Sequence, residues 1–277
     1  MKYEIINWKA IFILLLIITF ALFFFFPFYF MVSSSFKQPL DSSIYPPLIV
    51  DFKPTLKNYF TIFKKYPMDT YFINSFIVAF FATLISMVLA IPASYGMERL
   101  ISKNRERVAY MFLTMQLIPP ISMVFALFWF ASWLGLLGTY WLLVIGYTLW
   151  NVPYAIWLTR GFFNTVPIEL EEAAFVDGAT RLWVLRKIVI PLTKPGIIAA
   201  TIFIFIGAWN EFTLAFFLTD TSTRTYPTTL GLFVTHQGIL WGPMFATATL
   251  GVIPIVFIAL LIRKHFVSAL TLGAVKG

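Results

Sequence analysis

Long hydrophobic runs constrain this chain more than any other feature of its sequence. A helix needs about 20 apolar residues to cross the hydrocarbon core of a bilayer. Six such stretches lie within residues 11–32, 72–96, 108–131, 139–159, 196–219 and 243–262. Hydrophobic residues make up 60% of the 277 residues and charged residues 12%, which leaves too little polar surface for a soluble globule. The sequence therefore predicts an all-α polytopic membrane protein with six transmembrane helices, folded as a single transmembrane domain over residues 1–277.

The basic residues predict how these spans cross the membrane. If the N-terminus lies in the cytoplasm, fourteen of the twenty Lys and Arg residues fall in cytoplasmic segments. The positive-inside rule therefore favours cytoplasmic termini at both ends. The first external loop, residues 33–71, is an exception because it holds five lysines. The net charge of +8 follows this topology and does not indicate nucleic-acid binding.

A secretory signal is an alternative interpretation of the first apolar run, since lysines precede the run and small residues follow it. Its 22 residues exceed the roughly 7 to 15 of a signal core, so we expect an uncleaved span. In the loop that follows, we expect a short helix over residues 58–63. That loop is either a contact for a soluble solute-binding protein or a simple connector.

A charged block between the fourth and fifth spans predicts a short helix outside lipid. Pro167 suits a first helical position, and the acidic residues that follow complement the helix N-terminus. Gly178 is expected to end the segment in the left-handed conformation after about ten residues. Thr180 is expected to cap a second helical piece, which stops at Pro191.

One face of the predicted short helix carries small side chains. Leu170, Ala173 and Ala174 share this face at helical spacing, so another protein's surface could approach closely. The alternative is a solvated amphipathic loop without a partner.

The same block resembles the cytoplasmic loop of ABC importer permeases. Their pattern is Glu-Ala-Ala, three residues, Gly, nine residues, then Ile-X-Leu-Pro; Ile190 stands here where Leu is usual. The resemblance implies that residues 160–195 form a coupling loop whose helix docks into a cleft of an ATPase subunit. The residues that it assigns to ATPase coupling are Glu171, Glu172, Ala173, Ala174, Asp177 and Gly178.

Two further segments resemble permeases of carbohydrate importers, of the maltose and trehalose type. One is residues 209–212, Trp-Asn-Glu-Phe, and the other is the C-terminal tail. The resemblance implies that the tail reaches the ATPase interface, whereas a disordered tail is the alternative. The tail positions that match are Thr271, Gly273, Val275, Lys276 and Gly277.

Glu211 is an acidic residue well inside the predicted fifth span. An ionisable group there is costly unless it faces water or a partner, so it is a functional candidate. A structural hydrogen bond to a neighbouring helix or subunit is the competing explanation. The candidates for a translocation pathway are Trp209, Asn210, Glu211, Asn151, Trp150 and Tyr147.

Two glycine-rich nucleotide-binding motifs are absent, and nothing in the sequence marks a Ser-His-Asp arrangement. The sequence has neither Gly-X-X-X-X-Gly-Lys-Ser/Thr nor Gly-X-Gly-X-X-Gly, so we expect a non-catalytic subunit that binds no nucleotide or other cofactor itself. His236 and His265 lie in separate loops, and we expect no metal site. Without cysteine, the chain forms no disulfide.

The resemblance implies a permease subunit of a prokaryotic importer for di- or oligosaccharides such as maltose or trehalose, in the plasma (inner) membrane. It implies a homologous second permease, two ATPase subunits that bind ATP and Mg, and an extracytoplasmic sugar-binding protein. Three alternatives stay open: a proton-coupled carrier that uses Glu211, an ABC permease for a non-sugar solute, and a scaffold that transports nothing.

Overall fold

A computed structural model describes the backbone of residues 8–101 and 103–274, and the side chains of residues 9, 11–101 and 103–261. The chain divides into two compact units. The first takes the described part of residues 1–68 together with 230–252, and the second takes residues 69–229 with the described part of 253–277. The sequence-based prediction of one domain remains a prediction.

The first unit begins with a long apolar helix, α1 (Trp8–Ser35). It continues through the 3-10 turn η1 (Asp41–Ser43) and helix α2 (Lys57–Lys65), then resumes at η3 (Leu230–Phe233). A two-stranded antiparallel hairpin follows, β1 (Val234–Thr235) and β2 (Gly238–Ile239), and leads into α12 (Trp241–Ala274), which ends in the second unit. The short helix expected near residues 58–63 is confirmed as α2.

Buried polar contacts hold α2 in the first unit. The Asn58 side-chain amide donates to the carbonyls of Ser35 and Lys37 at 2.8 and 2.7 Å. Tyr59 shares a 2.7 Å hydrogen bond with the Ser35 hydroxyl. The two Asn58 bonds satisfy carbonyls at and just after the end of α1 that lack helical donors.

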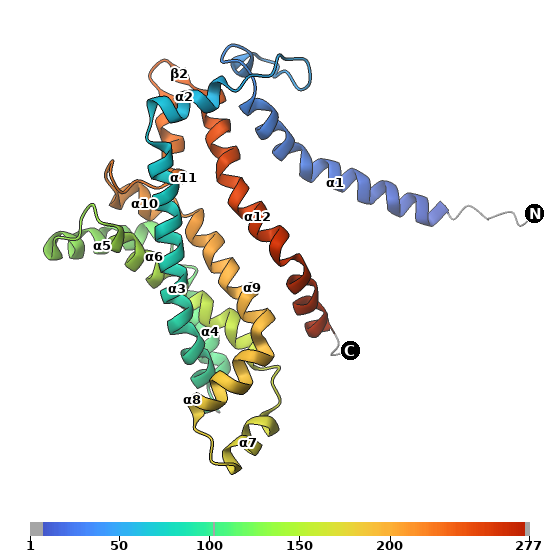
Figure 1. The fold of residues 1–277 in the computed structure, drawn as a ribbon, viewed down its shortest axis with the longest axis vertical. Coiled ribbons are helices and arrows are strands. Elements are labelled where there is room, and N and C mark those ends of the chain that lie inside the picture. Colours follow the sequence, from blue (N-terminus) through green and yellow to red (C-terminus); the bar gives the residue numbers. More distant parts are fainter. Residues whose placement is uncertain (1–7, 102, 275–277) are drawn as a thin grey trace, which may run out of the picture. The chain divides into compact units, whose positions relative to one another are not determined.

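The second unit is built almost wholly of helices (Figure 1). In chain order they are α3 (Met68–Leu100), α4 (Arg105–Met115), α5 (Pro120–Leu134), α6 (Tyr140–Phe163), α7 (Ile168–Val176), α8 (Arg181–Val184), the π-helical turn η2 (Leu185–Val189), α9 (Ile190–Trp209), α10 (Thr213–Leu218) and α11 (Tyr226–Thr229). Helices α6 and α9 pack along each other, and α7 with α8 lies at one end of this unit.

The predicted third span is a bent pair of helices. α4 and α5 meet at 80° across residues 116–119, where Pro119 is extended and Pro120 begins α5. Proline supplies no amide donor and disfavours helical backbone in the residue before it, so two successive prolines break the helix. The Gln116 side chain donates to the Trp150 carbonyl at 2.7 Å and ties the break to α6.

The predicted fifth span, residues 196–219, is wrong at both ends. α9 begins earlier, at Ile190, and ends at Trp209, and the separate helix α10 follows after Phe212. Hydropathy alone does not report this break, because the residues on both sides are apolar.

Five helices in the described part of the chain are long and apolar enough to cross a membrane, or six if the bent pair α4 and α5 counts as one span. The fold class is therefore confirmed as an all-α polytopic membrane protein. α3 contains Pro92 and still continues as one helix to Leu100.

Candidate coupling site

Helix α7 begins and ends with strong local signals. Pro167 is extended and lies just before the helix, so its predicted place as the first helical residue is off by one position. Glu169 and Glu171 lie in the first turn, where carboxylates complement the helix dipole. Gly178 has φ +85°, as predicted, and its N–H bonds the Phe175 carbonyl at 3.0 Å. The Ala179 N–H reaches the Ala174 carbonyl at 2.9 Å, which completes a Schellman motif.

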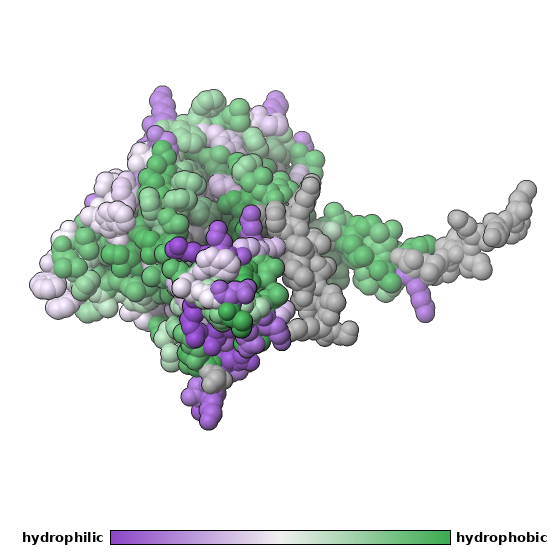
Figure 2. All heavy atoms as spheres, turned by 60° about the horizontal axis from the view of Figure 1, so that its bottom comes forward, coloured by the Kyte–Doolittle hydropathy of each residue, from purple (hydrophilic) through white to green (hydrophobic). Residues whose placement is uncertain are grey.

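Most of α7 presents its side chains to the outside. Glu172, Ala173 and Asp177 are exposed, Val176 is 87% exposed, and Ala174 is half-buried. Hydrophilic side chains gather at this end of the second unit (Figure 2). An exposed, charged helix beside apolar spans is a surface that lipid would not cover.

Glu171 differs from the other residues of α7 because it is 1% exposed. Its carboxylate accepts from Arg99 Nε at 2.7 Å and from the Tyr95 hydroxyl at 2.8 Å. Arg99 also donates to the carbonyls of Phe163 and Val166 at 3.2 and 3.0 Å, just where α6 ends. Glu171 was grouped with the ATPase-coupling residues, but its side chain faces the interior of this chain.

The segment after α7 continues into the membrane span. Thr180 caps α8 as predicted, and its hydroxyl accepts from the Trp183 N–H at 3.3 Å. The predicted stop at Pro191 is wrong, since α9 runs through both Pro191 and Pro195. The preceding π-helical turn has the Ile190 N–H on the Leu185 carbonyl, and this wider turn leaves room for prolines that lack an N–H.

A hollow of about 380 Å³ lies between the end of α7 and α8. Its lining combines small residues with one aromatic ring and one carboxylate: Ala174, Asp177, Gly178, Ala179, Thr180 and Trp183. Three of the predicted coupling residues, Ala174, Asp177 and Gly178, therefore meet at one concave surface.

A second ion-pair cluster lies next to the Arg99 contacts. Glu98 is 4% exposed and accepts from Arg160 Nε at 2.8 Å, and Arg105 approaches it to 3.2 Å. Arg160 also bonds Glu106. The cluster joins the ends of α3 and α6 to the start of α4.

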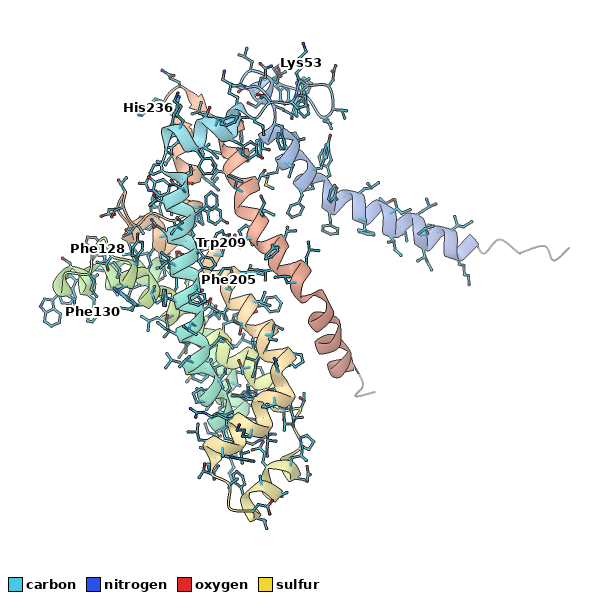
Figure 3. The ribbon with its side chains drawn as sticks, viewed as in Figure 1. Lys53, Phe128, Phe130, Phe205, Trp209 and His236 are labelled. Carbon is cyan, nitrogen blue, oxygen red and sulfur yellow. The ribbon has the colours of Figure 1, made fainter. Side chains whose placement is uncertain are left out.

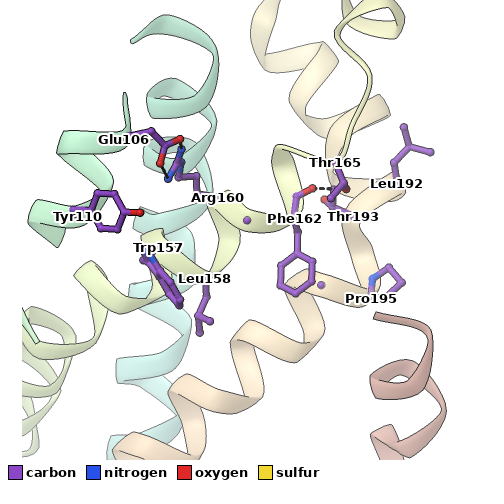
Figure 4. Close-up of a pocket in the computed structure, with 12 residues that line it drawn as sticks. Glu106, Tyr110, Trp157, Leu158, Arg160, Phe162, Thr165, Leu192, Thr193 and Pro195 are labelled. Atoms are coloured by element: carbon purple, nitrogen blue, oxygen red, sulfur yellow. Dashed lines mark hydrogen bonds and ion pairs between the residues drawn. The ribbon is translucent and has the colours of Figure 1, made fainter. Parts of the chain in front are cut away.

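Arg160 and Glu106 also line a cavity of about 490 Å³ (Figure 4). The rings of Tyr110, Trp157 and Phe162 form much of its wall. Gly196 lies against the Phe162 ring, so α9 approaches the end of α6 closely here.

The predicted pathway residue Trp209 is the last residue of α9 and lies near Phe205 of the same helix (Figure 3). It is buried and stacks with Phe72 and Phe205, and its ring centroid lies 4.9 Å from that of Tyr226. The Tyr226 hydroxyl donates to Asn210 Oδ1 at 2.9 Å. The structure thus brings Trp209 and Asn210 together in one aromatic cluster.

Glu211 lies at the break after α9, not inside a continuous helix. Its carboxylate accepts from the N–H groups of Leu214 and Ala215 at 2.8 and 3.2 Å, so it caps α10. The Tyr147 hydroxyl donates to the Glu211 carbonyl at 3.3 Å. A structural hydrogen-bonding role, the competing explanation for Glu211, therefore has observed partners.

The other two pathway candidates are on α6. Asn151 is buried, with its side chain beside Gly207 of α9, whereas Trp150 is half-buried and its carbonyl receives the Gln116 bond. Asn151 therefore contacts α9, whereas Trp150 contacts the break between α4 and α5.

A loop near this cluster is fixed by short polar bonds. Bonds from Ser222 and Thr223 hold the pKa of the Asp220 carboxyl below its ordinary value. The Asn74 side-chain amide donates to the carbonyls of Ser222 and Arg224 at 2.9 and 2.8 Å.

Comparison with known proteins matches residues 90–271 to the family described as binding-protein-dependent transport system inner membrane component. The match covers more than half of the chain. The chain belongs to this family.

Similar proteins agree with this membership. The chain is 35% identical to the trehalose/maltose transport system permease protein MalG of Thermococcus litoralis. The aligned region covers 97% of this chain and 98% of the relative. A crystal structure of a bacterial ABC transporter involved in the import of the acidic polysaccharide alginate has a chain with a TM-score of 0.74 and 20% identity, with 96% of this chain and all of that chain covered. The alginate transporter bound to a pentasaccharide-loaded periplasmic protein gives 0.66 at 19% identity, with 93% of each chain covered. The resemblance found in the sequence is confirmed.

The predicted tail of this inner membrane component falls largely outside the described structure. Thr271 and Gly273 lie in the α12 backbone, without described side chains, and Val275, Lys276 and Gly277 lie outside the described residues. Their role at an ATPase interface stays a prediction.

Sequence reasoning missed the ion pairs that organise the coupling end of this inner membrane component. Glu98 and Arg99 stand together after the predicted second span, and Arg160 follows the predicted fourth span. Charged residues at helix ends are expected near a membrane surface, so their positions in the sequence do not indicate which residues they pair with. Only the fold brings Arg99 to Glu171, which is 72 residues away.

Proposed function

We propose that the chain is the translocation subunit of an ATP-driven ABC importer for di- or oligosaccharides such as maltose or trehalose. The observation that carries this proposal is the exposed helix α7, which is capped at its C-terminal end and anchored through buried Glu171. Similarity to the trehalose/maltose permease and to the alginate transporter supports the sugar class.

The functional complex would contain a homologous second permease, two ATPase subunits and an extracytoplasmic sugar-binding protein. ATP and Mg would bind to the ATPase subunits, and the permease itself would perform no chemistry. The alginate transporter seen with a periplasmic protein supports the last partner. The permease would lie in a prokaryotic plasma (inner) membrane with both termini in the cytoplasm, as its basic residues favour.

In this proposal α7 receives the force. Glu172, Ala173, Ala174, Asp177 and Gly178 would form the docking surface, because they are exposed or line the hollow beside α8. Closure of the ATPases would shift α7 and tilt the spans, so that the pathway opens outward and then inward. The tail residues Thr271, Gly273, Val275, Lys276 and Gly277 would add a second contact.

The test is uptake by the purified complex in vesicles. The permease is co-purified with the products of its neighbouring genes, and entry of labelled maltose and trehalose is measured with ATP, with a non-hydrolysable analogue and with a proton uncoupler. Uptake that needs ATP hydrolysis and resists the uncoupler supports the proposal. Uptake that needs only a proton gradient supports the Glu211 carrier, and no flux of any solute supports a scaffold.

Glu172→Lys tests the docking surface. We expect ATP-driven uptake to fall at least about tenfold, because a reversed charge on the exposed face of α7 weakens contact with the motor. The amount of protein in the membrane should not change. Asp69→Lys reverses another exposed acidic charge, at the first turn of α3, and serves as the control. Full uptake by Glu172→Lys would contradict this role.

A further inference from the structure

Two adjacent charged residues at the end of α3 form ion pairs with different helices. Glu98 pairs with Arg160 of α6 and with Arg105 of α4, at 2.8 and 3.2 Å. Arg99 pairs with Glu171 of α7 at 2.7 Å. The last turn of α3 is therefore joined by ion pairs to three other helices.

Arg99 has further contacts that fix its position. One guanidinium nitrogen donates to the carbonyls of Phe163 and Val166, the last residue of α6 and a residue of the loop before α7. The Tyr95 hydroxyl, one helical turn before Arg99, donates to the other oxygen of Glu171. Both Glu171 oxygens therefore have donors, and these bonds connect α3, α7 and the loop that follows α6.

Burial makes this contact specific. The side chains of Arg99 and Glu171 are 9% and 2% exposed. An unpaired charge at such a place is costly, so α7 cannot move away from α3 without exposing or neutralising both groups. The exposed acids of α7, Glu169 and Glu172, impose no such restriction.

Two short segments connect α7 to its neighbours along the chain. Residues 164–167 join it to α6 and residues 177–180 join it to α8, and neither segment is helical. Ala174 of α7 also packs against an apolar cluster that includes Tyr95 of α3. The Arg99 contact is a direct, side-chain connection to a helix of 33 residues.

We propose that Arg99, Tyr95 and Glu171 form a positioning lock that makes α7 move as one rigid body with α3 and the end of α6. This inference rests on the proposed function, because it describes how a force on α7 reaches the spans. Glu171 then acts through Arg99 and not by touching the ATPase.

The first experiment measures coupling in the reconstituted complex, as sugar molecules imported per ATP hydrolysed. Arg99→Gln and Glu171→Gln remove the charges with little change of shape. We expect this ratio to fall at least about fivefold in both variants, with ATP hydrolysis retained. Arg107→Gln and Asp69→Asn remove exposed charges from α4 and α3 and should leave the ratio unchanged.

A merely structural role gives a different result. It would lower the amount of assembled complex, and transport and hydrolysis would fall together with an unchanged ratio. That outcome would overturn the lock. Tyr95→Phe removes one hydrogen bond and keeps the ion pair, so it supplies a folded variant with a smaller fall in the ratio if the charge variants fail to assemble.

The second experiment does not depend on transport. Because the chain has no cysteine, spin labels can be attached at Lys103→Cys, after α3, and Val176→Cys, at the end of α7. In the full chain in nanodiscs, we expect a narrow label–label distance distribution that broadens with Arg99→Gln and stays narrow with Arg107→Gln. An unchanged distribution in Arg99→Gln overturns the lock. If the wild-type complex shows no ATP-driven uptake, the proposed function fails, and this measurement still decides whether the lock exists.

Discussion

The absence of a side chain at Gly196 sets how closely α9 approaches the end of α6. A Cβ atom built there would lie 2.1 Å from Cγ of Phe162 and 2.3 and 2.6 Å from two other ring atoms. No contact between non-bonded atoms is that short, so alanine at this position would have to displace the ring. The same packing forms one wall of the cavity beside Arg160.

Gly196→Ala is therefore expected to lower the free energy of unfolding by about 1–3 kcal/mol, the usual cost of overpacking. Thermal unfolding followed by tryptophan fluorescence in detergent measures it.

Gly161→Ala is the matched control, since Gly161 lies in α6 and a Cβ there meets nothing within 4 Å. It should raise stability by roughly 0.5–1 kcal/mol through the helix preference of alanine. An unchanged melting temperature in Gly196→Ala would show that Phe162 moves freely and that the close approach has no energetic weight.

At the scale of elements, the ends of short helices depend on single residues. α7 is nine residues long, a length at which helices are marginal without caps and packing. Its C-terminal end relies on Gly178 in the left-handed region, and a Cβ there would meet no neighbouring atom. Any effect of a substitution at Gly178 is therefore conformational and does not come from a clash.

Gly178→Ala should cost about 1–2 kcal/mol, because an L-residue is strained at this φ. We expect the end of α7 to fray and trypsin to cleave at Arg181 on the order of fivefold faster in the solubilised chain. Gly178→Asn should cleave at an intermediate rate, since Asn tolerates the left-handed region better. Equal cleavage rates in the three proteins would rule out the role of the glycine cap.

Helix α10 has six residues and begins at a carboxylate. Both Glu211 oxygens accept backbone N–H groups, one from Leu214 and one from Ala215. This arrangement explains how an acidic residue is accommodated between two apolar helices.

Glu211→Gln should retain most ATP-driven uptake, because the amide oxygen still accepts one of these bonds. Glu211→Leu removes both acceptors and should lower uptake and expression together. Rates of uptake by the two variants in the same type of vesicle test whether Glu211 acts only as a hydrogen-bond acceptor. A complete loss in Glu211→Gln would instead indicate that the ionised carboxylate is required, as a proton-coupled carrier needs.

At the scale of the whole molecule, the distribution of basic residues predicts which segments face the cytoplasm. A single cysteine at Lys103→Cys should be shielded from a membrane-impermeant maleimide in intact cells and react after lysis. A cysteine at Lys57→Cys, in α2, should react in intact cells. Both positions are exposed in the structure, so a difference between them reports the side of the membrane. The reverse pattern of labelling would invert the topology and place α7 outside the cell.

The sequence predicted the features that depend on local chemistry. The hydrophobic runs located the spans, and Gly178 and Thr180 marked the end of α7 and the start of α8, because caps act within a few residues. The bend at Pro119 and Pro120 is also local, since it follows from two successive prolines. The end of α9 was harder to predict from the sequence, because Trp209 packs there against the Tyr226 ring, a partner further along the chain.

Burial of charge was the least predictable property of the coupling site. Three acidic residues occur within four positions of α7, and their sequence context does not distinguish them. Only Glu171 points toward α3, because 3.6 residues per turn place it opposite the exposed face. Its partner is specified by how α3 and α6 end beside each other, which no local pattern encodes.

The 72-residue separation between Arg99 and Glu171 has a consequence for biosynthesis. A ribosome that has just released α3 needs on the order of ten seconds to add the residues that carry the acidic partner. Until then Glu98 and Arg99 lack their partners Arg160 and Glu171, and charges are costly in hydrocarbon, so we expect this doublet to keep the end of α3 at the membrane surface. The same two charges that later join the helices would first limit how far the end of α3 enters the membrane.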